Sequence, residues 1–257
     1  MLEFVHQGAR LAFIDERPAA QSRGNPVLLI HGFASTHAVN WVFPQWVRTL
    51  TEAGRRVIAF DNRGHGRSQK LYDPASYSLL KMAEDARALL DALAIPVADV
   101  MGYSLGARIA AFLANAHAHR LRSMILGGLG DHLVSRPGLP LSIAAAMEAP
   151  SIECLVDPAD RTFRSFAEAT KSDLKALAAC VRGARQSLTE AEVFAFGIPV
   201  LIVMGTEDNV GGDPHVLANL FRQARVVDVP ERDHNQTVGD KLYKVSVLDF
   251  LEQSVND

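Results

Sequence analysis

The sequence predicts an α/β fold, a mostly parallel eight-stranded sheet with helices on both faces and a small helical cap insertion. Two observations support this fold class. Short apolar runs alternate with longer stretches whose apolar residues recur at helical spacing. One stretch of about 70 residues between two of these runs holds helical pieces and no clear strand. The 257 residues are enough for one large domain.

Eight segments are expected to be strands. Pro26–Ile30 reads PVLLI and has no polar face, as expected for the middle of a parallel sheet. Leu2–His6 and Leu11–Asp15 surround Gly8 and predict a hairpin at the start of the chain. The remaining expected strands are Arg56–Asp61, Val97–Tyr103, Leu121–Leu126, Pro199–Met204 and Arg225–Val229.

Helices are expected between most of these strands. Trp41–Ala53 ends before Gly54, a residue type that commonly follows a helix. Leu79–Leu93 ends before Pro96, which cannot continue a helix. Further helices are expected at Leu105–His117, Pro214–Gln223 and Asp240–Gln253. Parallel strands need crossover connections, and these helices supply them.

The interruption from Gly127 to Gly197 predicts a helical insertion, because a structureless loop of that length is uncommon in a compact domain. We therefore divide the chain into an α/β core, residues 1–130 and 198–257, and a helical cap, residues 131–197. The apolar segments of this insertion favour a partly apolar substrate, or else they pack the cap helices together. Cap helices are expected at Leu141–Glu148, Ser165–Ala169 and Lys171–Gly183.

Composition excludes several classes of protein. The 26 basic and 29 acidic residues are spread along the chain, so neither nucleic acid nor a strongly charged partner is indicated. Cys154 and Cys180 are too few for a disulfide framework and have no metal-ligand spacing. We expect a small-molecule substrate, no metal and no cofactor, and the sequence leaves the oligomeric state open.

The sequence carries no sign of a membrane or secretory segment. Met1–Arg10 includes Glu3 and lacks the long apolar stretch of a signal peptide. Elsewhere no apolar run reaches the ~18 residues that a membrane span needs. These features predict a cytoplasmic protein in a reducing compartment.

Gly102-Tyr103-Ser104-Leu105-Gly106 has the G-x-S-x-G pattern directly between an expected strand and an expected helix. A serine on such a sharp turn has a strained backbone, and its neighbours two positions away must be small. The turn exposes the hydroxyl above the carboxyl end of the sheet, where open α/β sheets bind ligands. It also directs helix N-terminal amides at a developing anion. Ser104 is therefore the candidate nucleophile.

Four segments, each after an expected strand, together resemble the α/β-hydrolase fold superfamily over nearly the whole chain. They are His31-Gly32-Phe33, Asp61–Ser68, the Gly102–Gly106 motif, and the pair formed by Gly205–Asp208 and Asp233-His234. The resemblance implies a hydrolase in which Ser104 is the nucleophile, His234 the general base and Asp208 the acid that orients it.

The resemblance also implies an oxyanion hole formed by the backbone N–H groups of Phe33 and Leu105. Asp131 is the alternative triad acid, because some members of the superfamily take the acid from that position. His31 is expected to brace its loop through hydrogen bonds rather than act as a base. The Asp61–Ser68 loop is expected to be a turn held by its own polar side chains.

Three hypotheses of function are consistent with these residues. The first is hydrolysis of a carboxylic ester, or similar acyl bond, through an acyl-enzyme. The second is cofactor-free perhydrolysis, lactone hydrolysis or carbon–carbon bond hydrolysis on the same triad. The third is a ligand receptor without catalysis, against which the complete set of Ser104, Asp208 and His234 argues.

Overall fold

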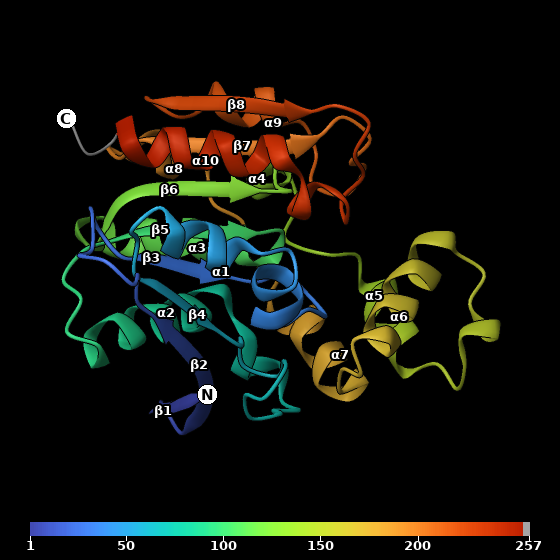
Figure 1. Cartoon of the computed structure of the whole chain (residues 1–257). Coiled ribbons are helices and arrows are strands. Elements are labelled where there is room, and N and C mark those ends of the chain that lie inside the picture. The colour runs from blue at the N-terminus through green and yellow to red at the C-terminus, as the bar shows by residue number, and fades with distance from the viewer. Residues whose placement is uncertain (254–257) are drawn as a thin grey trace.

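The computed structural model describes residues 1–253, in which eight strands form one sheet (Figure 1). The strand order is β1-β2-β4-β3-β5-β6-β7-β8. β1 and β2 form an antiparallel hairpin, β2 is antiparallel to β4, and every other pair is parallel. The expected mostly parallel eight-stranded sheet is confirmed. The strands are β1 (Leu2–His6), β2 (Ala9–Glu16), β3 (Val27–Ile30), β4 (Val57–Phe60), β5 (Ala98–Tyr103), β6 (Leu121–Gly127), β7 (Val200–Gly205) and β8 (Ala224–Val229).

Helices cover both faces of the sheet because alternate residues of each strand point to opposite sides. In β3, Leu28 and Ile30 pack in the cluster that contains α2 and α3 residues, whereas Val27 and Leu29 pack with α1 and α10. The helices outside the segment between β6 and β7 are η1 (Ala38–Val42), α1 (Trp46–Glu52), η2 (Pro74–Tyr77), α2 (Leu79–Ala92), α3 (Leu105–His117), η3 (Ala118–Arg120), α9 (Pro214–Ala218), η5 (Thr237–Gly239) and α10 (Lys241–Gln253).

A run of helices occupies the chain between β6 and β7. Figure 1 shows α5, α6 and α7 beside the ends of the central strands at which the arrowheads lie, which are their carboxyl ends. Thr170, at the end of α6, donates a 2.8 Å hydrogen bond from Oγ1 to the carbonyl oxygen of Ala34 and so ties this region to the loop after β3. The helices are α4 (His132–Ser135), α5 (Leu141–Glu148), η4 (Ile152–Cys154), α6 (Pro158–Ala169), α7 (Leu174–Gly183) and α8 (Glu190–Phe194).

Some expected helix bounds are wrong for local reasons. The helix expected from Trp41 begins at Trp46, because Gln45 has the left-handed φ of 68° and separates it from η1. α6 is longer than the expected Ser165–Ala169, since Asp157 caps its amino end by accepting from two backbone amides. α7 begins at Leu174, after its own cap Asp173, and α9 ends at Ala218 rather than at Gln223.

Among the described residues, no helix has the length and apolar character that a membrane crossing requires.

Candidate active site

Ser104 lies at the turn between β5 and α3 with φ 53° and ψ −113°, a conformation that L-residues rarely adopt. A Cβ atom on Gly102 would lie 2.2 Å from the carbonyl oxygen of Gly106, and one on Gly106 would lie 2.0 Å from that of Ile30. Neither position has room for a side chain. The two glycines of the motif are therefore needed for the turn that presents Ser104, as the sequence indicates.

His234 and Asp208 meet from two different loops. His234 follows β8, Asp208 follows β7, and Nδ1 of His234 donates a 2.7 Å hydrogen bond to Oδ2 of Asp208. The other oxygen, Oδ1, accepts from the amides of Val210 at 2.8 Å and Gly211 at 3.2 Å. Burial by itself raises the pKa of Asp208, but these hydrogen bonds outweigh it and hold the pKa below its ordinary value. The acid is thus ionised at neutral pH.

The loop that carries His234 is fixed by its neighbours. Tyr103 donates a 2.5 Å hydrogen bond from its hydroxyl to the carbonyl oxygen of His234, and the two rings lie 5.4 Å apart between centroids. Thr237 donates from Oγ1 to the carbonyl oxygen of Asp233 at 2.6 Å. The residue beside the serine therefore also positions the imidazole.

Asp131, the alternative acid, has other partners. Its Oδ1 accepts from the amide of Asp213 at 2.7 Å, and its Oδ2 accepts from the hydroxyl of Ser135 at 2.9 Å. Within the described part of the chain it makes no hydrogen bond to His234. The geometry favours Asp208 as the partner of the histidine.

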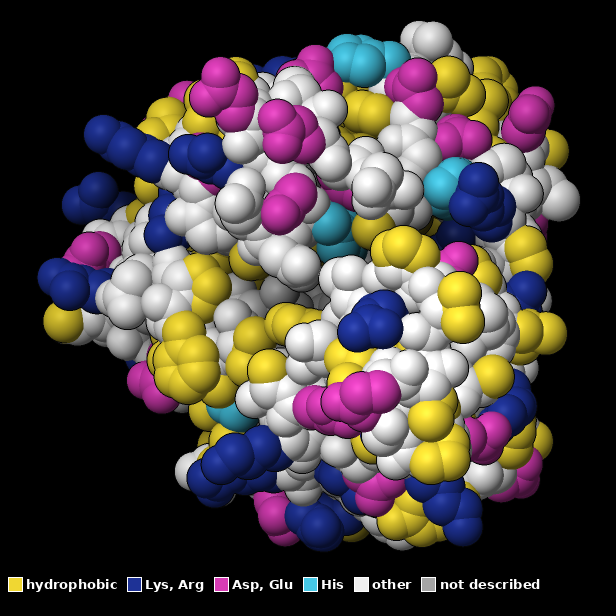
Figure 2. Space-filling model, turned by 90° about the vertical axis from the view of Figure 1, so that its right-hand side faces the viewer, with side chains coloured by type: hydrophobic (Ala, Val, Ile, Leu, Met, Phe, Trp, Pro, Cys, Tyr) yellow, Lys and Arg dark blue, Asp and Glu magenta, His cyan; other side chains and the backbone are white. Residues whose placement is uncertain are grey.

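Two cavities meet at Ser104. The first, of about 340 Å³, is lined by Ser104, His234 and the loop around Gly32 and Asn40. The second, of about 450 Å³, is lined by Ser104, Leu105 and residues of the segment between β6 and β7. Figure 2 shows the hollow in the surface at this edge of the molecule, with hydrophobic side chains beside it. The structure therefore brings the expected nucleophile and base to one cavity wall.

The expected oxyanion hole has two free donors. The amides of Phe33 and Leu105 donate to no backbone or side-chain acceptor among residues 1–253. Leu105 opens α3, where a helix leaves its first N–H groups unpaired. The amide before Phe33 is different, since Gly32 donates to Oδ1 of Asn40 at 2.8 Å. The N–H groups of Phe33 and Leu105 therefore remain the proposed donors to an oxyanion.

His31 braces the loop after β3. Its Nδ1 donates to the carbonyl oxygen of Gly32 at 2.8 Å, and its Nε2 accepts from the amide of Asn62 at 2.9 Å. Complete burial lowers the pKa of His31 to about 4, so the ring is neutral at pH 7. Both ring nitrogens are engaged, which leaves neither free to take a proton from Ser104.

The Asp61–Ser68 loop is held by its own polar groups. Asp61 accepts from the amide of Arg67 at 2.7 Å and from Nδ1 of His37 at 2.7 Å. Ser68 donates from its hydroxyl to the carbonyl oxygen of Asp61 at 2.5 Å. The segment is thus a turn held by Arg67 and Ser68, and His37 joins it to the loop after β3.

The sequence interpretation did not identify Arg108 and His132 as site residues, yet both line the larger cavity. Arg108 is the one charged residue of α3, LGARIAAFLANAH, and it follows Ser104 by four positions. A charge in an otherwise apolar helix, one turn after the candidate nucleophile, is a sequence signal that could have found it. His132 had no comparable signal, because its place depends on how the segment after β6 folds back.

No group of three or more His, Cys, Asp or Glu side chains among residues 1–253 is arranged to hold a metal ion.

Comparison with known proteins agrees with this fold. The family described as alpha/beta hydrolase fold matches residues 25–140. The chain is 41% identical over 103 residues to the candidate carbamate hydrolase RutD of Variovorax paradoxus, covering 40% of this chain and 37% of that protein. It is 38% identical over 109 residues to the 2-hydroxymuconate semialdehyde hydrolase of Pseudomonas sp. CF600, covering 41% of this chain and 36% of that protein. The alignments thus span less than two thirds of these curated relatives.

Solved structures share the fold over the whole chain. The enol-lactonase from Burkholderia xenovorans LB400 superposes with a TM-score of 0.79 and 19% sequence identity, covering 100% of both chains. At that identity the likeness concerns the fold alone. Together with the family model that matches residues 25–140 and the strand order, it shows that this chain has the α/β-hydrolase fold.

Proposed function

We propose that this chain is a serine hydrolase that cleaves a carboxylic ester, or a similar acyl bond, of a small and partly apolar substrate. One observation carries the proposal. Ser104, in a strained turn at the start of α3, lines the same cavity as His234. Nδ1 of this histidine lies 2.7 Å from Oδ2 of Asp208. Strained serines at such turns are a recurrent feature of nucleophilic catalysis.

The proposed reaction has two halves. Ser104 Oγ attacks the carbonyl carbon while His234 Nε2 takes the hydroxyl proton, and the oxyanion accepts from the amides of Phe33 and Leu105. When the bond to the leaving alcohol breaks, His234 returns the proton to the alcohol oxygen. Water then attacks the acyl-enzyme, giving its proton to His234, and the free acid leaves as Ser104 recovers a proton.

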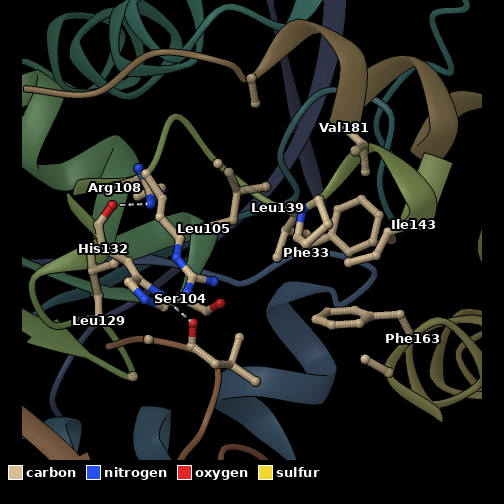
Figure 3. Close-up of a pocket in the computed structure, with 18 of the residues that line it drawn as sticks. Phe33, Ser104, Leu105, Arg108, Leu129, His132, Leu139, Ile143, Phe163 and Val181 are labelled. Atoms are coloured by element: carbon tan, nitrogen blue, oxygen red, sulfur yellow. Dashed lines mark hydrogen bonds between the residues drawn. The ribbon is translucent and has the colours of Figure 1, made fainter. Parts of the chain in front are cut away.

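Each of the two cavities is assigned one half of the ester substrate. His234 must reach the leaving oxygen, and it lines only the smaller of the two, so the alcohol half is assigned there. The acyl half then lies in the larger cavity, beyond Leu105. Its wall includes the apolar side chains Leu129, Leu139, Ile143, Phe163 and Val181 (Figure 3).

We also propose that residues 131–197 act as a cap. Leu139 and Ile143 on this segment supply part of the wall of the acyl cavity, and Phe163 lines both cavities. A cap of this kind selects substrates by shape and excludes water from the acyl-enzyme until the alcohol has left.

A fluorophosphonate probe tests the nucleophile directly. We expect stoichiometric labelling of the wild type at Ser104, found by peptide mass spectrometry, and no labelling of Ser104→Ala. Ethyl esters of two- to eight-carbon acids should be turned over repeatedly by the wild type and not by the variant. Labelling at another residue, or full activity in Ser104→Ala, would overturn the assignment.

A second candidate function uses the same triad to cleave a bond other than a carboxylic ester. The similarity to a 2-hydroxymuconate semialdehyde hydrolase supports carbon–carbon bond hydrolysis, and the carbamate name of RutD supports a carbamate. Kinetics on esters, lactones, carbamates and ring-fission products, with one preparation, ranks these bonds by kcat/KM. Perhydrolysis is tested in the same panel by adding hydrogen peroxide, and a receptor would show no turnover beyond one equivalent.

A further inference from the structure

Arg108 is a buried cation in the wall of the proposed acyl cavity. It is 7% exposed and lies in the first turn of α3, where its backbone amide donates to the carbonyl oxygen of Ser104 at 3.1 Å. Both residues line the larger cavity. Nη2 of Arg108 donates to the carbonyl oxygen of His132, whereas its Nη1 is buried and has no hydrogen-bond partner. The guanidinium of Arg108 is therefore near the proposed nucleophile and has an unpaired donor, Nη1.

The charge of Arg108 is also unbalanced. No carboxylate among residues 1–253 forms an ion pair with it, whereas each of the other three buried arginines in that range has one, such as Arg63 with Asp85 at 2.6 Å. Burial and the nearby cation of Arg185 lower the pKa of Arg108 to about 10. Arginine stays protonated at neutral pH, and an unpaired buried cation is unfavourable. A bound anion would therefore balance the charge of Arg108.

The surroundings of Arg108 distinguish the two ends of the cavity. Figure 3 shows Arg108, His132 and Ser104 together at one end, and Phe33, Ile143 and Phe163 at the other. His132 donates from Nδ1 to the carbonyl oxygen of Val210 at 2.8 Å, which fixes its ring in the wall. Arg108 and His132 thus make the part of this wall next to Ser104 polar, whereas Ile143 and Phe163 make another part of it apolar.

We propose that Arg108 binds a carboxylate on the acyl half of the substrate, so that the preferred substrate is a monoester of a short dicarboxylic acid. This inference rests on the proposed hydrolase function and names its substrate class. A carboxylate is planar and accepts two parallel N–H bonds from a guanidinium, so it would give Nη1 its missing acceptor. Because Nη1 is shielded in the free protein, binding requires the guanidinium to turn toward the cavity.

The acidic residues that line the cavity do not supply the anion that pairs with Arg108. Asp157 is exposed and accepts from the amides of Ala159 and Asp160, where it caps α6. Asp160 accepts from the hydroxyl of Ser142 at 2.9 Å. Both carboxylates therefore have partners of their own, and neither forms an ion pair with Arg108.

Matched esters test the proposal, because they differ only in the terminal group. Monoethyl succinate is compared with ethyl butanoate, and monoethyl glutarate with ethyl pentanoate, by titrating the released acid at pH 7. We expect the wild type to prefer the charged member of at least one pair by about tenfold or more in kcat/KM. In Arg108→Gln we expect this ratio to fall about tenfold or more, to one or below, since a buried charged hydrogen bond is lost.

Arg136→Gln is the matched control. Arg136 also lines this cavity but is exposed, so the variant removes the same charge from the rim while leaving Arg108 in place. We expect its ratio to stay within about threefold of the wild type. An equal loss of preference in both variants, or a wild-type ratio near one, would mean that the buried guanidinium does not select the substrate.

Binding to Ser104→Ala separates this inference from the proposed function and does not depend on the folding of an Arg108 variant. Calorimetry should show monoethyl glutarate binding about tenfold more tightly than ethyl pentanoate. If the probe labels Ser104 in the wild type but both esters bind equally to the variant, the carboxylate site is wrong and the hydrolase stands. If monoethyl glutarate binds selectively but the wild type neither reacts with the probe nor turns over esters, the hydrolase is wrong and the anion site stands.

Discussion

Nδ1 of His234 lies 2.7 Å from Oδ2 of Asp208, although the two residues are 26 positions apart in the chain. The carboxylate is completely buried, and it is held on its other side by two backbone amides. This arrangement fixes both the orientation and the tautomer of the imidazole, and it leaves Nε2 as the nitrogen that can act on Ser104.

Asp208→Asn should therefore abolish the proposed hydrolase activity with little change in the fold. An amide in this position can donate to Nδ1 and so favour the wrong tautomer, and we expect kcat on an ethyl ester to fall about 10⁴-fold. Asp131→Asn is the control, and its kcat should change by less than about threefold because Asp131 is bonded to Asp213 and Ser135 instead. The reverse pattern in steady-state kinetics would make Asp131 the acid.

Gly106→Ala should damage the nucleophile turn. Its Cβ would meet the carbonyl oxygen of Ile30 at 2.0 Å, and backbone on both sides would have to move. We expect a loss of at least about 2 kcal/mol in the free energy of unfolding, measured in urea, together with loss of probe labelling.

Gly197→Ala is the matched control for that change, because a Cβ at Gly197 would have no atom within 4 Å. We expect its free energy of unfolding to stay within about 0.5 kcal/mol of the wild type. If Gly106→Ala were as stable and as reactive as Gly197→Ala, steric crowding would not explain the glycine in the motif.

Acid should unfold the protein partly through His31 and His65. Burial lowers their pKa values to about 4 and about 3, far below the ordinary value of 6.5. Between pH 6.5 and about 4 the unfolded chain therefore binds protons that the folded chain does not. Stability must fall as the pH falls through this range, by about 1.4 kcal/mol per pH unit for each histidine.

A His65→Asn variant tests this directly. The variant removes one of the two buried rings, so the slope of the free energy of unfolding against pH should fall by about 1.4 kcal/mol per unit between pH 6 and 4. Urea titrations at several pH values give that slope whatever the absolute stability of the variant. An unchanged slope would show that His65 is not kept neutral by the fold.

Arg164 should be important for the stability of the segment between β6 and β7. It is 5% exposed, and its Nη1 donates to the carbonyl oxygens of Ala146 at 2.7 Å and Ala149 at 3.0 Å at the end of α5. Arg164→Met leaves these groups without a donor, and we expect a loss of about 2 to 4 kcal/mol, measured by urea unfolding. Arg48→Met removes an exposed pair with Glu52 and should cost less than about 1 kcal/mol.

Much of the fold could be predicted because its determinants are local. β3 and β5 are apolar runs bounded by turn residues, and α3 follows the G-x-S-x-G turn at once. The helix expected from Trp41 failed at Gln45, where a left-handed residue that propensity does not foresee separates two short helices.

The sequence by itself determined the succession of strands and helices along the chain and the residue types able to form a hydrolytic site, since hydrophobic periodicity and the steric needs of a tight turn act over a few residues. Only the tertiary structure decided which carboxylate contacts His234 and which cation lines the proposed acyl cavity. Asp208 and Asp131 both follow parallel strands at the same edge, and their partners depend on how distant loops fold back. Arg108 became a candidate for the same reason, because the missing counter-charge of a buried group is a property of everything packed around it.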